Sequence, residues 1–289
     1  MSIDVPLSVA GALVGLLVGL TGMGGGALLT PILVLVFGVP PLAAVSSDLV
    51  TSMIMKPVAA AVHWRRNTVE PVLVGWLALG SIPAAVLGAG LVGWFGHAKP
   101  VQHDLKIAIG CVLLLSLAAN LTRAGLDAGA RPAGEPFAVR PARTVAIGVV
   151  GGFAVGLTSV GAGSVIIALL LLAYPMLSPR QLVGTDIVQA IPLVAAAALS
   201  HLLFGEVRLS VTGSLLVGAL PAAYLGARLS IRLRTAWLQP VIVAVLLASA
   251  LALLSVPTPT LLVAVGLTAG ASAAVSNRRA AQERIPART

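Results

Sequence analysis

Two short glycine-rich stretches interrupt long apolar runs, and their backbone amides and hydroxyls could bind an anion. Residues 21–26 read TGMGGG, and residues 158–163 read TSVGAG. An interrupted helix leaves free N–H groups at the start of its second half, where the helix dipole also favours negative charge. The candidate anion-binding residues of the two stretches are Thr21, Gly22, Gly24, Gly25, Gly26, Thr158, Ser159, Gly161, Gly163 and Ser164.

A second interpretation of these glycines stays open. Small residues also let membrane helices cross at short distance, and glycines that serve this purpose need no ligand. In the first interpretation, by contrast, glycine allows the sharp turn and lets a ligand approach the backbone closely.

Lys56 lies well inside an apolar segment, SMIMKPVAA at residues 52–60, where a lone ammonium group is costly. It could pair with an anionic substrate or with Asp48, which is eight residues earlier and therefore on a similar helix face. Alternatively, its long side chain snorkels to the membrane interface. Gln189, one turn after Asp186, is a candidate neutral donor to an oxyanion.

Four ionisable residues are candidates for proton coupling: Asp48, Asp186, His63 and His201. Ionisable groups within membrane segments are usually functional, and histidine titrates near neutral pH. For the two carboxylates the alternative is a place in the first turn of a helix, behind a capping Ser or Thr. For the two histidines the alternative is an interfacial place at a helix C-terminus, where the dipole favours a cation.

The composition around these residues is that of a membrane protein. Of 289 residues, 58% are hydrophobic and 9% are charged, whereas soluble domains carry roughly 25% charge. The mean hydropathy is +1.05. The net charge of +9 comes largely from arginines in short loops and the C-terminal tail, which indicates contact with anionic lipid rather than with nucleic acid.

Apolar runs of spanning length predict an all-α, polytopic membrane protein. Seven runs fit one crossing each, at about 43–63, 71–94, 104–122, 183–203, 207–229, 236–254 and 258–276. The runs at about 5–37 and 145–177 would be about 50 Å long as straight helices, too long for a bilayer core of about 30 Å. We therefore expect each to break, or to fold back as a hairpin, at its glycine-rich stretch.

The sequence also repeats itself once. Offsets of 137 and then 138 residues superpose the two glycine-rich stretches, the two candidate aspartates and histidines, and GSIPAAVLGA at 80–89 on GALPAAYLGA at 218–227. We expect a first repeat at 1–122, a cytoplasmic linker at 123–143, a second repeat at 144–254, and an extra helix with a basic cytoplasmic tail at 255–289. The arginines orient the repeats oppositely, a pattern typical of secondary transporters with a site near the midplane.

These features resemble the TauE/SafE sulfite exporter family over nearly the whole chain. The resemblance rests on the duplicated glycine-rich segment, the GTD after its second copy, the His and GEV that end the next helix, and the GxxPAAxxGA helix. It implies an alternating-access permease for sulfite, sulfonates or related small oxyanions, with protons as a candidate coupling ion. The first copy departs from the second, with SSD in place of GTD and HWRRNTV in place of HLLFGEV.

Three other function classes are the alternatives: an enzyme, a membrane scaffold and a channel, of which the channel is disfavoured by the inverted, interrupted helices. The sequence has no HExxH, no GxSxG and no metal-ligand cluster, so we expect neither an enzyme nor a metal or other cofactor. A non-transporting membrane scaffold or assembly protein would move no solute and would tolerate Lys56→Ala. The expected partners are a small anion and the lipid of the inner (plasma) membrane, and the oligomeric state is left open.

Overall fold

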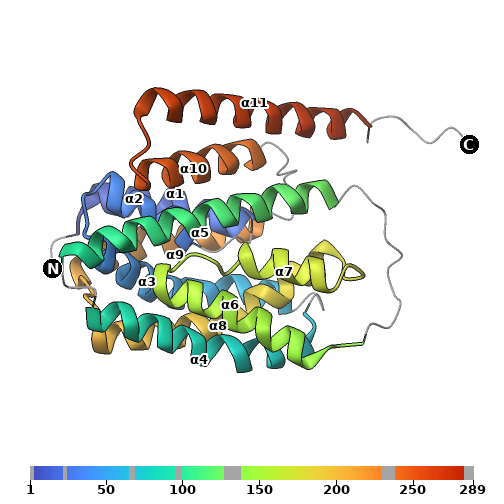
Figure 1. Cartoon of the computed structure of the whole chain (residues 1–289), viewed down its shortest axis with the longest axis horizontal. Helices are drawn as coiled ribbons and strands as arrows, with labels where there is room; N and C mark the ends of the chain where they lie inside the picture. Colours follow the sequence, from blue (N-terminus) through green and yellow to red (C-terminus); the bar gives the residue numbers. More distant parts are fainter. Residues whose placement is uncertain are drawn as a thin grey trace, which may run out of the picture.

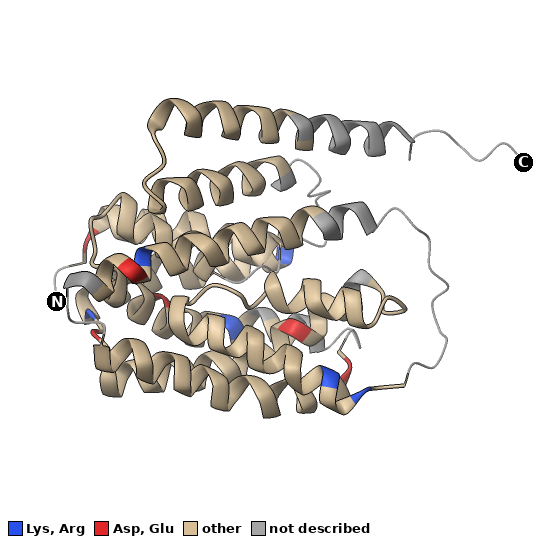
Figure 2. Ribbon diagram, in the orientation of Figure 1, with Lys and Arg blue, Asp and Glu red and all other residues tan. Residues whose placement is uncertain are grey.

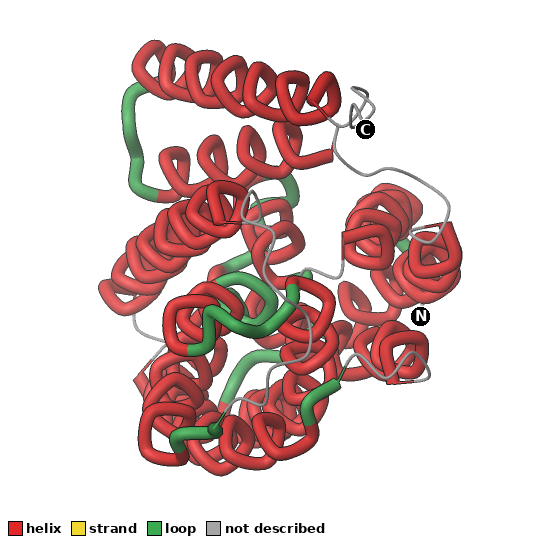
Figure 3. Tube along the Cα trace, turned by 90° about the vertical axis from the view of Figure 1, so that its right-hand side faces the viewer, coloured by secondary structure: helices red, strands yellow, loops and turns green. Residues whose placement is uncertain are grey.

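The computed structural model describes residues 3–21, 25–64, 69–95, 99–126, 138–229 and 238–282, and every regular element in these ranges is a helix (Figures 1 and 3). The helices are α1 (Val5–Thr21), α2 (Gly26–Leu35), α3 (Pro41–Trp64), α4 (Pro71–Phe95), α5 (Lys99–Leu126), α6 (Pro141–Thr158), α7 (Val165–Ala173), α8 (Pro179–Phe204), α9 (Leu209–Leu229), α10 (Leu238–Leu253) and α11 (Thr258–Gln282). The all-α prediction is confirmed. Five of the described helices are long and apolar enough to cross a membrane, by length and composition.

Proline begins four of these helices, α3, α4, α6 and α8. Its fixed φ suits the first helical position, where the missing N–H costs nothing. Helix α8 is also capped by Ser178, whose Oγ accepts the N–H of Gln181 at 3.3 Å. Asp48 and Asp186 each lie seven residues beyond the first residue of their helix. The alternative that placed both carboxylates in the first helical turn is therefore wrong.

Both long apolar runs are broken at their glycine-rich stretches, as predicted. Helix α1 ends at Thr21 and α2 begins at Gly26, while α6 ends at Thr158 and α7 begins at Val165. In the second break Ser159 has φ 61°, and Gly161 and Gly163 have φ 135° and 91°, which are conformations that glycine adopts without strain. Gly22 and Gly24 of the first break lie outside the described residues.

The second run folds back to the end at which it started. The Tyr174 hydroxyl, directly after α7, lies 2.5 Å from Thr144 Oγ1 near the start of α6. The same hydroxyl accepts the N–H of Arg140 at 3.1 Å. The run at 145–177 is therefore a helical hairpin, with α6 and α7 as its two arms (Figure 1).

The helices of the two predicted repeats are interleaved. The most extensive helix pairings are α1 with α9 and α4 with α6, and each joins one helix from each predicted repeat. A Cβ added at Gly19 of α1 would lie 2.3 Å from Ala223 O, and one added at Gly156 of α6 would lie 2.3 Å from Ala85 O. These two glycines, which lie two residues before the ends of α1 and α6, therefore allow close contact between helices.

Helices α3 and α8 pack together in antiparallel directions. Ser46, near the start of α3, contacts His201 in the last turn of α8 at 2.8 Å. At the other end, Thr185 near the start of α8 accepts the N–H of Glu70, which follows α3. The equivalent helices of the two predicted repeats thus run in opposite directions.

The outer surface of the bundle is apolar. Large side chains such as Leu79, Leu87 and Leu91 of α4 are exposed, and Figure 2 shows few charged residues in the described part of the chain, most of them near helix ends. Helix α11 lies beside α10 at one edge of the bundle (Figure 1). These features are those of a multi-pass membrane protein.

Glycines on one helix provide a matched test of this packing. A Cβ at Gly80 of α4 would lie 2.2 Å from Val145 O of α6, whereas one at Gly75 would meet nothing within 4 Å. We expect Gly80→Ala to cost about 1–3 kcal/mol through overpacking. Gly75→Ala should be neutral or stabilise by up to about 1 kcal/mol through helix propensity. Thermal unfolding in detergent measures both, and equal effects would contradict the α4–α6 contact.

Candidate functional site

The two helix breaks touch each other in the interior of the bundle. A Cβ added at Gly26, the first residue of α2, would lie 2.0 Å from the carbonyl oxygen of Ser159 and 2.8 Å from its Oγ. Gly26 is completely surrounded by protein, and Ser159 is also buried. Only glycine allows the backbone of the second break to approach α2 so closely.

Asp48 lies at this contact and connects three parts of the chain. Its side chain is 0% exposed. Its Oδ2 accepts hydrogen bonds from Ser159 Oγ at 2.5 Å and from Thr30 Oγ1 at 2.9 Å, and its Oδ1 accepts one from Ser52 Oγ at 3.3 Å. The carboxylate thereby joins α3 to α2 and to the second break.

Thr30 and Ser52 were missed by the reasoning from sequence. Ser52 follows Asp48 by four residues, so the helical period already placed the two on one face. Thr30 carried no comparable signal, because its approach to Asp48 depends on how α2 packs against α3.

The amides at the start of α7 crowd onto one carbonyl. Gly161 O accepts the N–H groups of Ser164 at 3.4 Å, Val165 at 3.0 Å and Ile166 at 3.3 Å. A carbonyl oxygen has two lone pairs, so three donors are poorly satisfied by it. A charged acceptor that reached these amides would bind them more strongly, because charge-assisted hydrogen bonds are about twice as strong as neutral ones.

The candidate hydroxyls direct their protons to acceptors within the protein. Thr21 and Thr158 donate to the backbone carbonyls of Leu17 and Ala154, each at 2.7 Å. Ser164 donates to Ser116 Oγ of α5 at 2.8 Å. In the observed arrangement these three hydroxyls stabilise the helix ends.

Lys56 of α3 is 8% exposed and forms no hydrogen bond to any residue that the structure describes. Its ammonium is attracted by the carboxylates of both Asp186 and Asp48. The snorkelling alternative is wrong, because the side chain is enclosed by protein. Lys56 thus supplies one buried positive charge that two buried carboxylates share.

Asp186 and Gln189 lie together on α8, with 1% and 0% exposure. Gln189 Nε2 donates to Asp186 Oδ1 at 3.4 Å, and Gln189 Oε1 accepts from Ser81 Oγ of α4 at 3.3 Å. The structure therefore brings the predicted amide donor next to the second carboxylate and ties both to α4.

His201 is completely buried and bridges three helices. Its Nε2 donates to Gly156 O of α6 at 2.9 Å, and its Nδ1 lies 2.8 Å from Ser46 Oγ of α3. The interfacial alternative is therefore wrong for His201. His63 lies in α3, but its side chain is outside what the structure describes.

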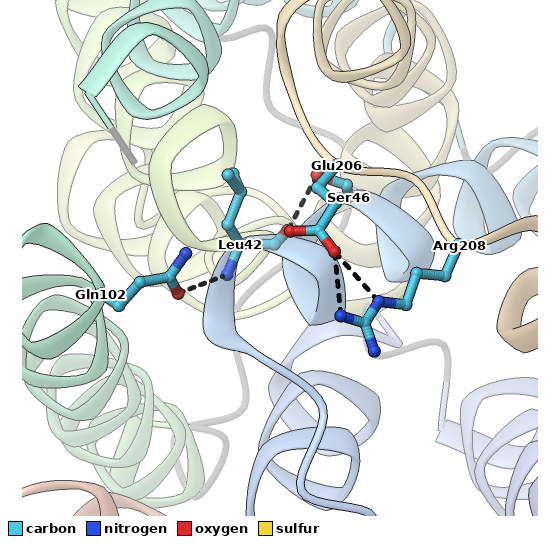
Figure 4. A network of polar contacts seen from close by, with 5 residues as sticks. All are labelled: Leu42, Ser46, Gln102, Glu206 and Arg208. Atoms are coloured by element: carbon cyan, nitrogen blue, oxygen red, sulfur yellow. Dashed lines mark hydrogen bonds and ion pairs between the residues drawn. The ribbon is translucent and has the colours of Figure 1, made fainter. Parts of the chain in front are cut away.

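Ser46 can form a hydrogen bond with His201 Nδ1 whether the imidazole ring is neutral or protonated. Ser46 Oγ also lies 2.8 Å from Leu42 O, so its single proton has two possible acceptors. With a neutral ring Ser46 donates to Nδ1, and with a protonated ring Nδ1 donates to Ser46, which then donates to Leu42 O. Figure 4 shows Ser46 with Leu42 and three neighbouring polar residues: Gln102 Oε1 accepts the Leu42 N–H at 3.3 Å, and Arg208 pairs with Glu206 at 2.9 Å.

Removal of the His201 ring should destabilise the fold. His201→Ala leaves Gly156 O without its donor, and an unsatisfied buried group costs about 1–3 kcal/mol. Ser200→Ala is the matched control, because among the described residues Ser200 Oγ bonds only Ala196 O of its own helix. Thermal unfolding of the purified variants measures the difference. Equal stability of the two variants would contradict the bridging role.

Comparisons with known proteins bear on nearly the whole chain. The sequence profile of the family described as "Sulfite exporter TauE/SafE" matches residues 7–253. A protein of Bacillus subtilis (strain 168) named "Probable membrane transporter protein YjnA" is 40% identical over 255 residues, which cover 87% of this chain and 100% of that protein. No solved structure matches the chain.

Proposed function

The chain belongs to the TauE/SafE sulfite exporter family of membrane transporters, and we propose that it carries sulfite, sulfonates or related small organosulfur oxyanions as a secondary transporter. The observation that carries the proposal is the contact of the two helix breaks in the core, with Gly26 against Ser159. Broken helices at membrane depth are tolerated where they are buried in protein or line a cavity, and they form the substrate sites of many secondary transporters.

The anion site that we propose combines Lys56 with the start of α7. Lys56 supplies a buried positive charge, and its ammonium donates no hydrogen bond to any described residue. The amides of Ser164, Val165 and Ile166 supply donors that share one carbonyl. An oxyanion would take these donors from Gly161 O, so its binding would change the shape of the break. Gln189 completes the set as a neutral donor.

Alternating access is the proposed mechanism, through inverted repeats. The antiparallel packing of α3 against α8 supports opposite orientation of the halves, as does the pairing of α1 with α9 and of α4 with α6. A rocking motion of one half against the other would expose the central site to each side in turn. The arginine distribution supports a cytoplasmic C-terminus in the plasma membrane.

Charge balance favours the entry of a cation with the anion. The buried charged residues of the described chain include two aspartates, Asp48 and Asp186, and one lysine. A bound anion would add a further negative charge to this region, which is costly at low dielectric. We propose that a coupling cation offsets it. Protons on Asp48, Asp186, His63 or His201 are the candidates from the sequence.

Transport of labelled anions tests the proposal. Purified protein in liposomes should accumulate [35S]sulfite or labelled sulfoacetate above protein-free vesicles, and unlabelled anion should compete. Accumulation equal to that of empty vesicles for all candidate anions would contradict the proposal. It would favour the alternative, a non-transporting scaffold, in which Lys56→Ala is also tolerated.

A further inference from the structure

We propose that the contact of the two breaks is a sodium site centred on Asp48. The inference rests on the proposed function only for its role in coupling, since the site itself is argued from geometry. Asp48 is 0% exposed, and no Lys, Arg or His nitrogen lies within 4.0 Å of its carboxylate among the residues that the structure describes. Lys56 is attracted by Asp186 as well as by Asp48, so the two buried carboxylates share one lysine. One negative charge in this region is left for a bound cation to offset.

The atoms around Asp48 are the ligands that a small hard cation requires. Three hydroxyl oxygens, of Thr30, Ser52 and Ser159, lie 2.5–3.3 Å from the carboxylate. They come from α2, from α3 and from the second break. No nitrogen or sulfur ligand takes part, and oxygen ligands are those preferred by hard cations.

A backbone carbonyl completes the oxygen set. The Ser159 carbonyl faces Gly26 at the end of α6, and it accepts no hydrogen bond from the described part of the chain. Carbonyls at the C-terminal end of a helix carry the negative end of its dipole. The ends of half-helices and unwound carbonyls coordinate Na⁺ in transporters of known mechanism.

The charge of the site selects a monovalent ion. Asp48 provides one negative charge, and the described residues contain no group of three His, Cys, Asp or Glu side chains that could hold a metal ion. The three hydroxyl oxygens lie only 2.5–3.3 Å from the carboxylate, and so compact a set of oxygens suits Na⁺ better than the larger K⁺.

Sodium binding to the purified full chain tests this proposal without any anion. Thermal unfolding in detergent is followed as NaCl replaces choline chloride at constant ionic strength and constant pH. We expect a saturable rise in melting temperature with Na⁺ and none with K⁺. Asp48→Asn should abolish the rise. Ser159→Ala and Ser52→Ala should each weaken the apparent affinity for Na⁺ roughly tenfold.

The serine variants provide the test if Asp48→Asn does not fold. In that case the weakened sodium response of Ser159→Ala and Ser52→Ala is compared with that of Ser200→Ala, a control that should respond to Na⁺ like the wild type. Equal responses to Na⁺, K⁺ and choline, or stabilisation that follows pH and not Na⁺, would overturn the sodium site. Anion uptake in sodium-free buffer by a chain that binds no Na⁺ would leave the transport proposal intact. Sodium binding without any anion flux would overturn the transport proposal alone.

Discussion

Lys56→Met should lower the affinity of the purified protein for sulfite by roughly 10- to 150-fold. The lysine is buried, and no described residue hydrogen-bonds its ammonium. A hydrogen bond to a charged group contributes about 1.5–3 kcal/mol, which corresponds to that range. Methionine keeps the length and unbranched shape of the side chain while it removes the charge. Equilibrium binding of [35S]sulfite to detergent-purified protein gives the affinity.

Two further variants show whether this loss reflects the anion. Lys106→Met is the matched control, because Lys106 is exposed on α5 and should leave the affinity unchanged. Lys56→Arg keeps the charge and should retain part of the affinity. The removal of Lys56 also leaves two buried carboxylates less compensated, which lowers stability, so binding is expressed per folded molecule after size-exclusion chromatography. Wild-type affinity in folded Lys56→Met would exclude Lys56 from the site.

Gly26→Ala should strongly impair transport, because its Cβ would lie 2.0 Å from Ser159 O. The backbones of the two breaks would have to separate. Overpacking of this kind costs about 1–3 kcal/mol. This cost lowers the population of the conformation in which the two breaks are in contact by roughly 5- to 150-fold. Initial rates of labelled sulfite uptake into proteoliposomes, normalised to reconstituted protein, measure the effect.

Gly90→Ala is the control for this substitution, since a Cβ at Gly90 of α4 would meet nothing within 4 Å. It introduces the same methyl group into a membrane helix and should keep the wild-type rate. An unchanged rate in Gly26→Ala, with the protein folded and reconstituted, would contradict a functional role for the contact.

The helices and their interruptions were predictable because they depend on local properties of the sequence. Spanning length follows from apolar runs, and excess length at 5–37 and 145–177 required the breaks that the structure has at Thr21 and Thr158. The glycines before the breaks illustrate a limit. Gly19 and Gly156 lie just before the breaks, and their role in close helix packing is evident only from their observed neighbours, Ala223 and Ala85.

The sequence identified the buried charged residues of the candidate site, but not the hydroxyl partners Thr30 and Ser52 or the contacts among its members. The sequence placed Asp48, Lys56 and Asp186 within apolar segments, where charge is costly. It paired Lys56 with Asp48 by helical period, and it did not show that Asp186 of a distant helix attracts the same ammonium. The donors to Asp48 come from three elements, so their convergence depends on tertiary packing. The division into repeats at 1–122 and 144–254, and the roles of the candidate residues, stay predictions.

The central claim is that an oxyanion binds at the second helix break, where the amides at the start of α7 and Lys56 are its donors. Selenite, a heavier analogue of sulfite, can be located by the anomalous scattering of selenium in crystals of the protein. The account predicts a selenium peak at the start of α7, in hydrogen-bonding contact with Lys56 Nζ and the amides of Ser164, Val165 and Ile166, that is lost in Lys56→Met crystals. A peak elsewhere in the bundle that persists in Lys56→Met crystals, or bound selenite at the protein surface alone, would contradict it.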